Sequence, residues 1–135
     1  MAGAAIDPKQ ADAPYWEGLR NGKLLMQKCE GCGEWQWPAV YRCGDCGRWD
    51  PPWREVPKSG TVFSWIRTHQ PFPGLEPFGL PFVSLLVELD DAGGNRLMGV
   101  LADGDGEIAI GDRVTGEIID RTINGMTMPT VVWRR

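Results

Sequence analysis

All four cysteines of the chain fall into two copies of the motif C-x-x-C-G, at residues 29–33 and 43–47. Two residues between the cysteines allow a tight turn that directs both sulfurs to one metal ion. The glycine after each pair can adopt a positive φ, so that backbone N–H groups point toward the thiolates. Two such turns that face each other complete a tetrahedral shell of four sulfurs. The predicted metal ligands are Cys29, Cys32, Cys43 and Cys46.

The composition of this shell predicts a structural zinc ion, one per chain. Four sulfurs leave no open position for the water that a catalytic zinc keeps. Iron suits the same thiolate shell, although the short separation of the pairs favours a zinc ribbon over an electron-transfer rubredoxin. A pair of redox dithiols is the alternative, but a thioredoxin-type site has one C-x-x-C where a strand meets a helix. Metal binding worth on the order of 10 kcal/mol would be the main source of stability for so small a ribbon.

The rest of the chain offers little catalytic chemistry. His69 is the single histidine. We find no Ser/His/Asp set, second base, Gly-rich phosphate loop or paired-carboxylate motif in the sequence. Because the thiols are committed to metal, no thiol nucleophile remains for acyl transfer. We therefore expect no catalytic residues in this chain.

The net charge of −4 over 135 residues limits the classes of partner. A protein that binds a nucleic-acid backbone needs clustered Lys and Arg to displace counterions, and the nearest approach to a cluster is the pair at residues 134–135. No apolar run reaches the roughly 18 residues of a membrane span, and residues 1–7 have neither the basic nor the apolar region of a secretory signal. We expect a cytoplasmic protein, in a reducing compartment, without a nucleic-acid or membrane partner.

The elements that must position the cysteines are mostly strands. Residues 12–22 predict a short helix, with Asp12 as its cap, Pro14 in its first turn and Gly22 at its end. Residues 23–28 then predict a strand that leads into the first cysteine pair. From residue 61 on, β-branched and aromatic runs alternate with Gly, Pro and Asp, which indicates strands joined by turns. The five strands predicted there are 61–69, 82–90, 96–102, 113–120 and 127–133.

Five short strands at this spacing suit a small Greek-key barrel such as the OB-fold, although periodicity alone does not select the OB-fold over other barrels. The predicted fold is therefore mainly β. It consists of an N-terminal tail and short helix in residues 1–22, a zinc ribbon in 23–57 and a five-stranded barrel domain in 58–135.

Two stretches carry more large apolar side chains than so small a protein needs for its core. The ribbon holds four of the seven tryptophans, and residues 70–81 alternate prolines with Phe and Leu. The tryptophans either pack against the barrel and helix or anchor a partner. The Pro-rich segment is either a lid on its own barrel or a docking surface for a partner or an acyl chain. The predicted interface residues are Trp35, Trp37, Phe72, Leu75, Phe78 and Leu80.

The first barrel strand carries Phe63, Trp65, Arg67 and His69 at alternate positions, which predicts that they share one face. Aromatic rings beside a cation can bind a nucleotide by stacking and phosphate pairing. Ordinary cross-strand packing produces the same pattern, so both interpretations stay open at this point.

The order of these features resembles a known family. The segment YWEGLRNGKLLMQKCEGCGEWQWPAVYRCGDCG is similar to the opening of proteins that join an N-terminal rubredoxin-like zinc ribbon to a C-terminal OB-fold. The segments SGTVFSWIRTH, PFVSLLVELD, IAIGDRVTGEI and MTMPTVVW resemble its barrel strands in the same order, so the likeness covers about residues 14–133. The chain departs from the family at 37–39, where a Pro-Pro pair and a basic residue are common, and at 44–45, where a proline is usual. Neither departure touches a ligand.

The resemblance implies a non-catalytic accessory subunit of an acyl-CoA enzyme. The implied partners belong to the thiolase superfamily: thiolases, sterol-carrier-protein-type thiolases that act as aldolases or acyltransferases, and 3-hydroxy-3-methylglutaryl-CoA synthase. A MaoC-like enoyl-CoA hydratase is a further implied partner. The family thus indicates a hetero-oligomer in steroid or fatty acyl-CoA metabolism, with acyl-CoA as a shared ligand bordered by Trp65, Arg67 and His69.

Two other classes of function compete with this interpretation. One is a single-stranded nucleic-acid-binding module, since zinc ribbons and OB-folds both serve that role. The other is an independent small enzyme. A basic groove would favour nucleic-acid binding, and the acidic balance of the chain counts against it.

Overall fold

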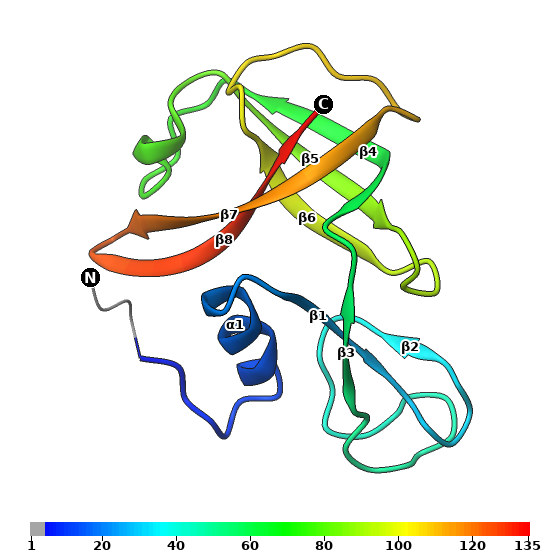
Figure 1. The fold of residues 1–135 in the computed structure, drawn as a ribbon. Helices are drawn as coiled ribbons and strands as arrows, with labels where there is room; N and C mark the ends of the chain where they lie inside the picture. Colours follow the sequence, from blue (N-terminus) through cyan, green and yellow to red (C-terminus); the bar gives the residue numbers. More distant parts are fainter. Residues whose placement is uncertain (1–4) are drawn as a thin grey trace.

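A computed structural model describes residues 5–135; the first four residues of the predicted tail lie outside this range. The strands form a three-stranded sheet in the order β2-β1-β3 and a closed barrel in the order β4-β5-β6-β8-β7 (Figure 1). The predicted fold class, mainly β with a short helix, a ribbon and a five-stranded barrel, is confirmed. The elements are α1 Ala13–Arg20, β1 Leu24–Lys28, β2 Trp35–Gln36, β3 Trp53–Val56, β4 Ser59–Thr68, the 3-10 helix η1 Glu76–Phe78, β5 Phe82–Leu89, β6 Arg96–Leu101, β7 Arg113–Ile123 and β8 Met126–Arg134.

The hairpin of β7 and β8 extends further than the sequence pattern predicted. Its ladder continues until Ile123 pairs with Met126, whereas the pattern ended the strand at residue 120. Asn124 and Gly125 have φ values of 53° and 78°. Two successive positive φ values give a two-residue turn whose twist matches that of the paired strands, so the ladder can run to the tip.

The helix α1 begins and ends close to its predicted positions, with Asp12 at the predicted cap position but without a cap hydrogen bond from its side chain. The Oδ2 of Asp12 instead accepts a hydrogen bond of 3.0 Å from the indole Nε1 of Trp16. Tyr15 and Leu19 on the same helix are buried. The helix is therefore oriented on the protein by its buried apolar face.

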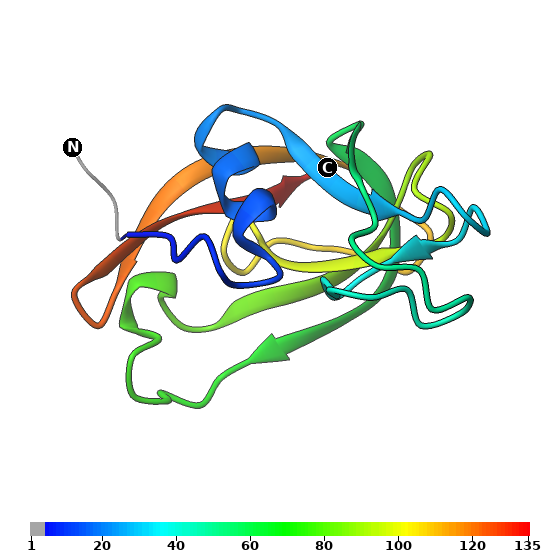
Figure 2. The same ribbon diagram turned by 90° about the horizontal axis from the view of Figure 1, so that it is seen from below.

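One continuous core joins the helix, the sheet and the barrel. Leu19 of α1, Met26 of β1 and Val56 of β3 are buried in the same cluster as Val62 of β4 and Trp133 of β8. The helix contacts both β1 and β8, and it lies against the barrel strands β7 and β8 in both views (Figures 1 and 2). Burial of these side chains therefore couples the stability of the ribbon to that of the barrel.

The hairpin connection between β5 and β6 makes a second contact with the ribbon. Gly93, with a φ of 64°, lies so close to Trp35 that a Cβ built on it would be 2.1 Å from the indole Cδ1. Nearby, the Asn95 amide Nδ2 lies 3.8 Å from the Met26 sulfur. Because only a glycine leaves room for the ring, Gly93 sets how closely β2 approaches the barrel.

Among residues 5–135, no helix is both long enough and apolar enough to cross a membrane.

We predict that Gly93→Ala destabilises the protein more than Gly94→Ala does. Both glycines have a positive φ, so both substitutions carry the same kind of backbone cost. At Gly94 the nearest atom to a built Cβ is a Glu88 carboxylate oxygen at 3.5 Å, which is an ordinary contact. The clash with Trp35 should therefore add about 1–3 kcal/mol for Gly93→Ala alone. Urea unfolding of the zinc-loaded proteins measures this difference, and equal losses would show that Trp35 moves aside freely.

Candidate functional site

Each cysteine pair lies in a turn with the same backbone hydrogen bonds. In the first turn the N–H of Gly33 donates to the carbonyl of Cys29 over 2.9 Å, and the N–H of Cys29 donates to the carbonyl of Glu34 over 2.9 Å. In the second turn the N–H of Gly47 donates to the carbonyl of Cys43 over 3.0 Å. The two glycines have φ values of 77° and 82°, as the motif predicted. The repeated motif therefore folds into two equivalent turns.

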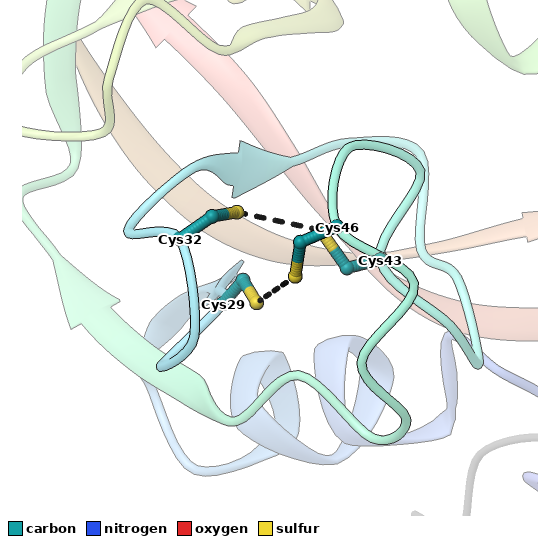
Figure 3. A group of neighbouring side chains, drawn as sticks. All are labelled: Cys29, Cys32, Cys43 and Cys46. Carbon is teal, nitrogen blue, oxygen red and sulfur yellow. Dashed lines mark hydrogen bonds between the residues drawn. The ribbon is translucent and has the colours of Figure 1, made fainter.

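The four sulfurs converge on one point between these turns (Figure 3). The sulfurs of Cys29 and Cys46 lie 3.5 Å apart, those of Cys32 and Cys43 lie 3.6 Å apart, and all four lie within 4.8 Å of one another. A tetrahedral ion with sulfur ligands at about 2.3 Å requires sulfur separations of roughly 3.8 Å. A disulfide requires about 2.05 Å, and all four cysteines are free thiols. The cysteines are thus placed to bind one metal ion.

The thiols cannot all ionise at this spacing without a cation. A hydrogen bond from the backbone of Cys32 is the main cause that lowers the pKa of the Cys29 thiol to about 7. At Cys32 the backbone of Glu34 also lowers the pKa, but burial and the neighbouring sulfurs outweigh it and raise the value to about 12. A divalent ion removes this conflict, because it stabilises every thiolate that it binds.

Two polar groups around Cys43 support its sulfur. The backbone N–H of Asp45 donates to this sulfur over 3.4 Å, and the Gln36 side-chain amide donates to it over 3.6 Å. The same amide donates to the Asp45 carboxylate over 3.1 Å. Such outer contacts orient a ligand and tune its basicity. The sequence analysis missed Gln36, because nothing in the sequence indicates that β2 brings it to the metal site.

The cluster has the character of a closed structural site. Cys29 and Cys43 are buried, and Cys32 and Cys46 face outward. Within residues 5–135 this is the one group of three or more His, Cys, Asp and Glu side chains close enough to hold a metal ion. The first pair follows the strand β1, and neither pair precedes a helix, so the arrangement does not match a thioredoxin-type dithiol.

Trp35 and Trp37, two predicted interface residues, are half-buried and pack against the shared core. Trp37 lies 4.7 Å from the ring of Tyr15, between centroids, and Trp35 lies against Gly93 with the Lys28 ammonium 5.5 Å from its ring. The structure does not bring these two rings together with the Pro-rich segment. Trp49, with 63% of its surface exposed, is the more accessible ring of the ribbon.

The Pro-rich segment folds back on the barrel and also leaves apolar surface exposed. Phe78 is half-buried, with its ring 5.1 Å from that of Phe82 on β5, and Leu75 is half-buried beside it. Phe72 and Leu80 keep 52% and 49% of their surface exposed. A cavity of about 350 Å³ lies between the segment and the barrel, with Phe72, Leu75, Phe78, Phe82 and Met98 in its wall.

On β4 a β-bulge between Val62 and Ser64 takes Phe63 out of the regular pairing, which runs without a shift from Ser64 to Thr68 and includes Trp65 and Arg67. The structure does bring Trp65 and Arg67 together, with the guanidinium 5.3 Å from the ring. Arg67 is also hydrogen-bonded to Asp105 at 2.6 Å. His69 follows the end of the strand and is exposed.

Comparison with protein families identifies both parts of the chain. Residues 16–51 match the rubredoxin-like zinc ribbon domain of ChsH2, and residues 53–118 match the C-terminal OB-fold domain of ChsH2. A chain of the Ltp2–ChsH2 (DUF35) aldolase is similar throughout, with 30% identity, a TM-score of 0.78 and 97% of each chain covered. A DUF35-family protein of unknown function from Sulfolobus solfataricus has the same fold, with 18% identity, a TM-score of 0.58 and coverage of 82% of this chain and 78% of that one.

A curated relative is the probable enoyl-CoA hydratase alpha subunit of Thermomonospora curvata. It is 33% identical over 99 residues, which are 70% of this chain. The match spans 30% of the length of that relative.

We predict that Cys43→Ser abolishes stoichiometric metal binding and lowers the free energy of unfolding by at least about 3 kcal/mol, because a neutral hydroxyl is a poor zinc ligand. The ribbon should melt before the barrel, whose apolar strands do not bind the metal. Elemental analysis of protein purified without added metal, together with thermal melts, measures both effects. Asp45→Asn is the matched control, since it lies next to the sulfurs without being a ligand. A folded wild-type protein with no bound metal would contradict the prediction.

Proposed function

Since the chain belongs to the ChsH2 family, which joins a rubredoxin-like zinc ribbon to a C-terminal OB-fold, we propose that it is a non-catalytic accessory subunit of an acyl-CoA enzyme. In this proposal it binds one structural Zn²⁺ and docks on a catalytic subunit of the thiolase superfamily. A steroid or fatty acyl-CoA would be the substrate of that partner. The aldolase and the hydratase subunit among its relatives support an acyl-CoA context.

The observation that carries the proposal is an exposed apolar surface on the barrel. We define the barrel patch as Ile66, Phe72, Leu80 and Met98, which keep 64%, 52%, 49% and 68% of their surface exposed. Met98 and Ser84 line both the cavity under the Pro-rich segment and a smaller one of about 150 Å³ beside Ile66. Phe72 also lines a third cavity with Leu80. The patch is therefore continuous, and continuous apolar surface of this kind supports a protein interface.

The potential nucleophiles and bases support a non-catalytic role. The four thiols converge on the metal site. His69 is exposed at the end of β4, and none of residues 5–135 forms a hydrogen bond or ion pair with it. A general base that acts in acyl transfer needs a partner that orients it, and the partner enzyme would have to supply this machinery.

Trp65, Arg67 and His69 are proposed to border the CoA moiety in the complex. The Arg67 guanidinium lies beside the Trp65 ring, which suits an adenine ring and a phosphate that bind side by side. Because Arg67 already pairs with Asp105, a phosphate would have to compete with that carboxylate.

We predict that Met98→Asp weakens assembly with the partner enzyme by at least about tenfold, because a charge in the centre of an apolar interface costs on the order of 2 kcal/mol. The partner is first recovered with the tagged wild-type chain from the native host and identified by mass spectrometry as a thiolase-superfamily enzyme. Its affinity for each variant and its acyl-CoA turnover are then measured with purified components.

Ile110→Asp provides the matched control for this experiment. Ile110 lies in the connection of β6 and β7 and is 70% exposed, so the variant adds the same charge at an equally exposed apolar site. Assembly and turnover should fall together for Met98→Asp while the zinc content stays at one. Equal losses in both variants would place the interface elsewhere, and turnover by the isolated chain would overturn the accessory role.

Binding to single-stranded nucleic acid is the second candidate function, and the pairing of the arginines argues against it. Five arginines each have a carboxylate oxygen within 3.8 Å; they are Arg48, Arg67, Arg113, Arg134 and Arg135. Cations paired in this way are not available to displace counterions from a phosphate backbone.

We therefore predict no measurable affinity for a single-stranded oligonucleotide at physiological salt. Fluorescence anisotropy with a labelled oligonucleotide tests this. A micromolar dissociation constant that weakens steeply with added salt would favour the nucleic-acid-binding alternative.

A further inference from the structure

A second cavity lies on the other side of Phe78, away from the barrel patch. It has a volume of about 390 Å³, and its wall comes from α1, η1 and the hairpin of β7 and β8. Trp16, Phe78, Met126 and Met128 supply much of its apolar surface. This volume falls within the range of small-molecule sites. In Figure 1, η1 (green) and α1 (blue) lie on either side of the extended β7–β8 hairpin.

Arg121 of β7 is the single ionisable group in the wall of this cavity. Its guanidinium lies 4.3 Å from the ring centroid of Phe78. The Nε atom is buried without a hydrogen-bond partner, and no carboxylate among residues 5–135 forms an ion pair with Arg121. Burial lowers the pKa of this guanidinium, yet arginine stays protonated at neutral pH. A cation with N–H donors to spare therefore borders an apolar cavity.

Four exposed arginines each have a carboxylate partner, namely Arg48, Arg113, Arg134 and Arg135. Arg121 is less exposed than they are, and its printed contact is with an aromatic ring. A desolvated charge without a counterion is costly, and a ring face compensates for it less well than a carboxylate does. The fork of a guanidinium matches a carboxylate in bidentate geometry. A bound carboxylate would thus supply the counterion that Arg121 lacks among residues 5–135.

From this arrangement we infer that the cavity binds an amphipathic carboxylate, with the carboxylate on Arg121 and the apolar body against Trp16, Phe78 and the two methionines. Because Arg121 is the one ionisable residue in the wall, the cavity favours a monoanion with one head group. The inference does not depend on the accessory role, because the cavity and its cation belong to this chain alone. Failure of the binding experiment below would leave the proposed function intact.

Isothermal titration calorimetry of the zinc-loaded protein with octanoate tests this inference. Octylammonium and octanol are the matched probes, since they carry the same chain with a positive or a neutral head. Octanoate should bind at least about tenfold more tightly than either probe, as expected for a charge-assisted pair in an apolar site. Equal binding of octanol would mean that only the chain is recognised, and the absence of octanoate binding would overturn the inference directly.

Two substitutions at Arg121 separate its charge from its packing. Arg121→Met keeps an apolar side chain of similar length and should lose at least about tenfold in octanoate affinity, with octanol affinity unchanged. Arg121→Lys keeps the charge without the fork and should fall between wild type and Arg121→Met. Arg54→Met removes the same charge from an exposed position on β3 and should bind octanoate as wild type does. Zinc content and circular dichroism confirm that each variant is folded.

Octanoate binding that is unchanged in Arg121→Met would overturn the assignment of Arg121. The remaining outcome concerns a protein partner. If the wild-type chain does not bind octanoate and Arg121→Met loses assembly with the partner enzyme, the cavity accepts an acidic side chain of that enzyme, and the inference of a small-molecule site is wrong.

Discussion

Four thiols within 4.8 Å of one another are the constraint on which the arrangement of the ribbon depends. Four negative charges at that distance repel strongly, so the fully ionised cluster requires a bound cation. The first of these cysteines follows β1 directly, and β1 carries Leu24 and Met26 into the core. The metal site thus fixes the end of the strand that joins the ribbon to the rest of the molecule.

The helix α1 links the ribbon to the barrel and to the cavity that borders Arg121. α1 packs on β1 and on β8, and its Trp16 forms part of the wall around Arg121. Phe78 belongs to the Pro-rich segment, and its ring also packs against Phe82 of β5. This packing leaves the barrel patch exposed. Phe78 therefore separates two apolar sites of different character. One is an exposed surface without a charge among its four defining residues, while the other is a cavity that borders a cation. This difference is the physical basis for assigning one to a protein partner and the other to a small amphipathic anion.

Sequence reasoning succeeded where the relevant signal is local. The cysteine spacing predicted a site that needs only two tight turns, and the apolar run between turn residues at 82–90 predicted the strand β5. It failed where the deciding contact comes from elsewhere in the chain. The bulge after Val62 takes Phe63 out of the regular pairing of β4, and the Asp12 side chain bonds the Trp16 indole in place of the helix end. The setting of Arg121 depends on a ring more than forty residues away in sequence, so no pattern around β7 indicated it.

The shared core also bears on how such proteins can change by recombination. The family matches divide the chain near residue 52, yet Leu19 and Met26 on one side of that point are buried with Val62 and Trp133 on the other. Exchanging the segment before residue 52 with that of a relative would place the helix of the relative against the barrel of this chain. The chimera would have mismatched side chains in a close-packed interior, where even one added or missing methyl group lowers the stability. The two segments are distinct in the sequence, but because they share one core we expect them to be exchanged between relatives only together.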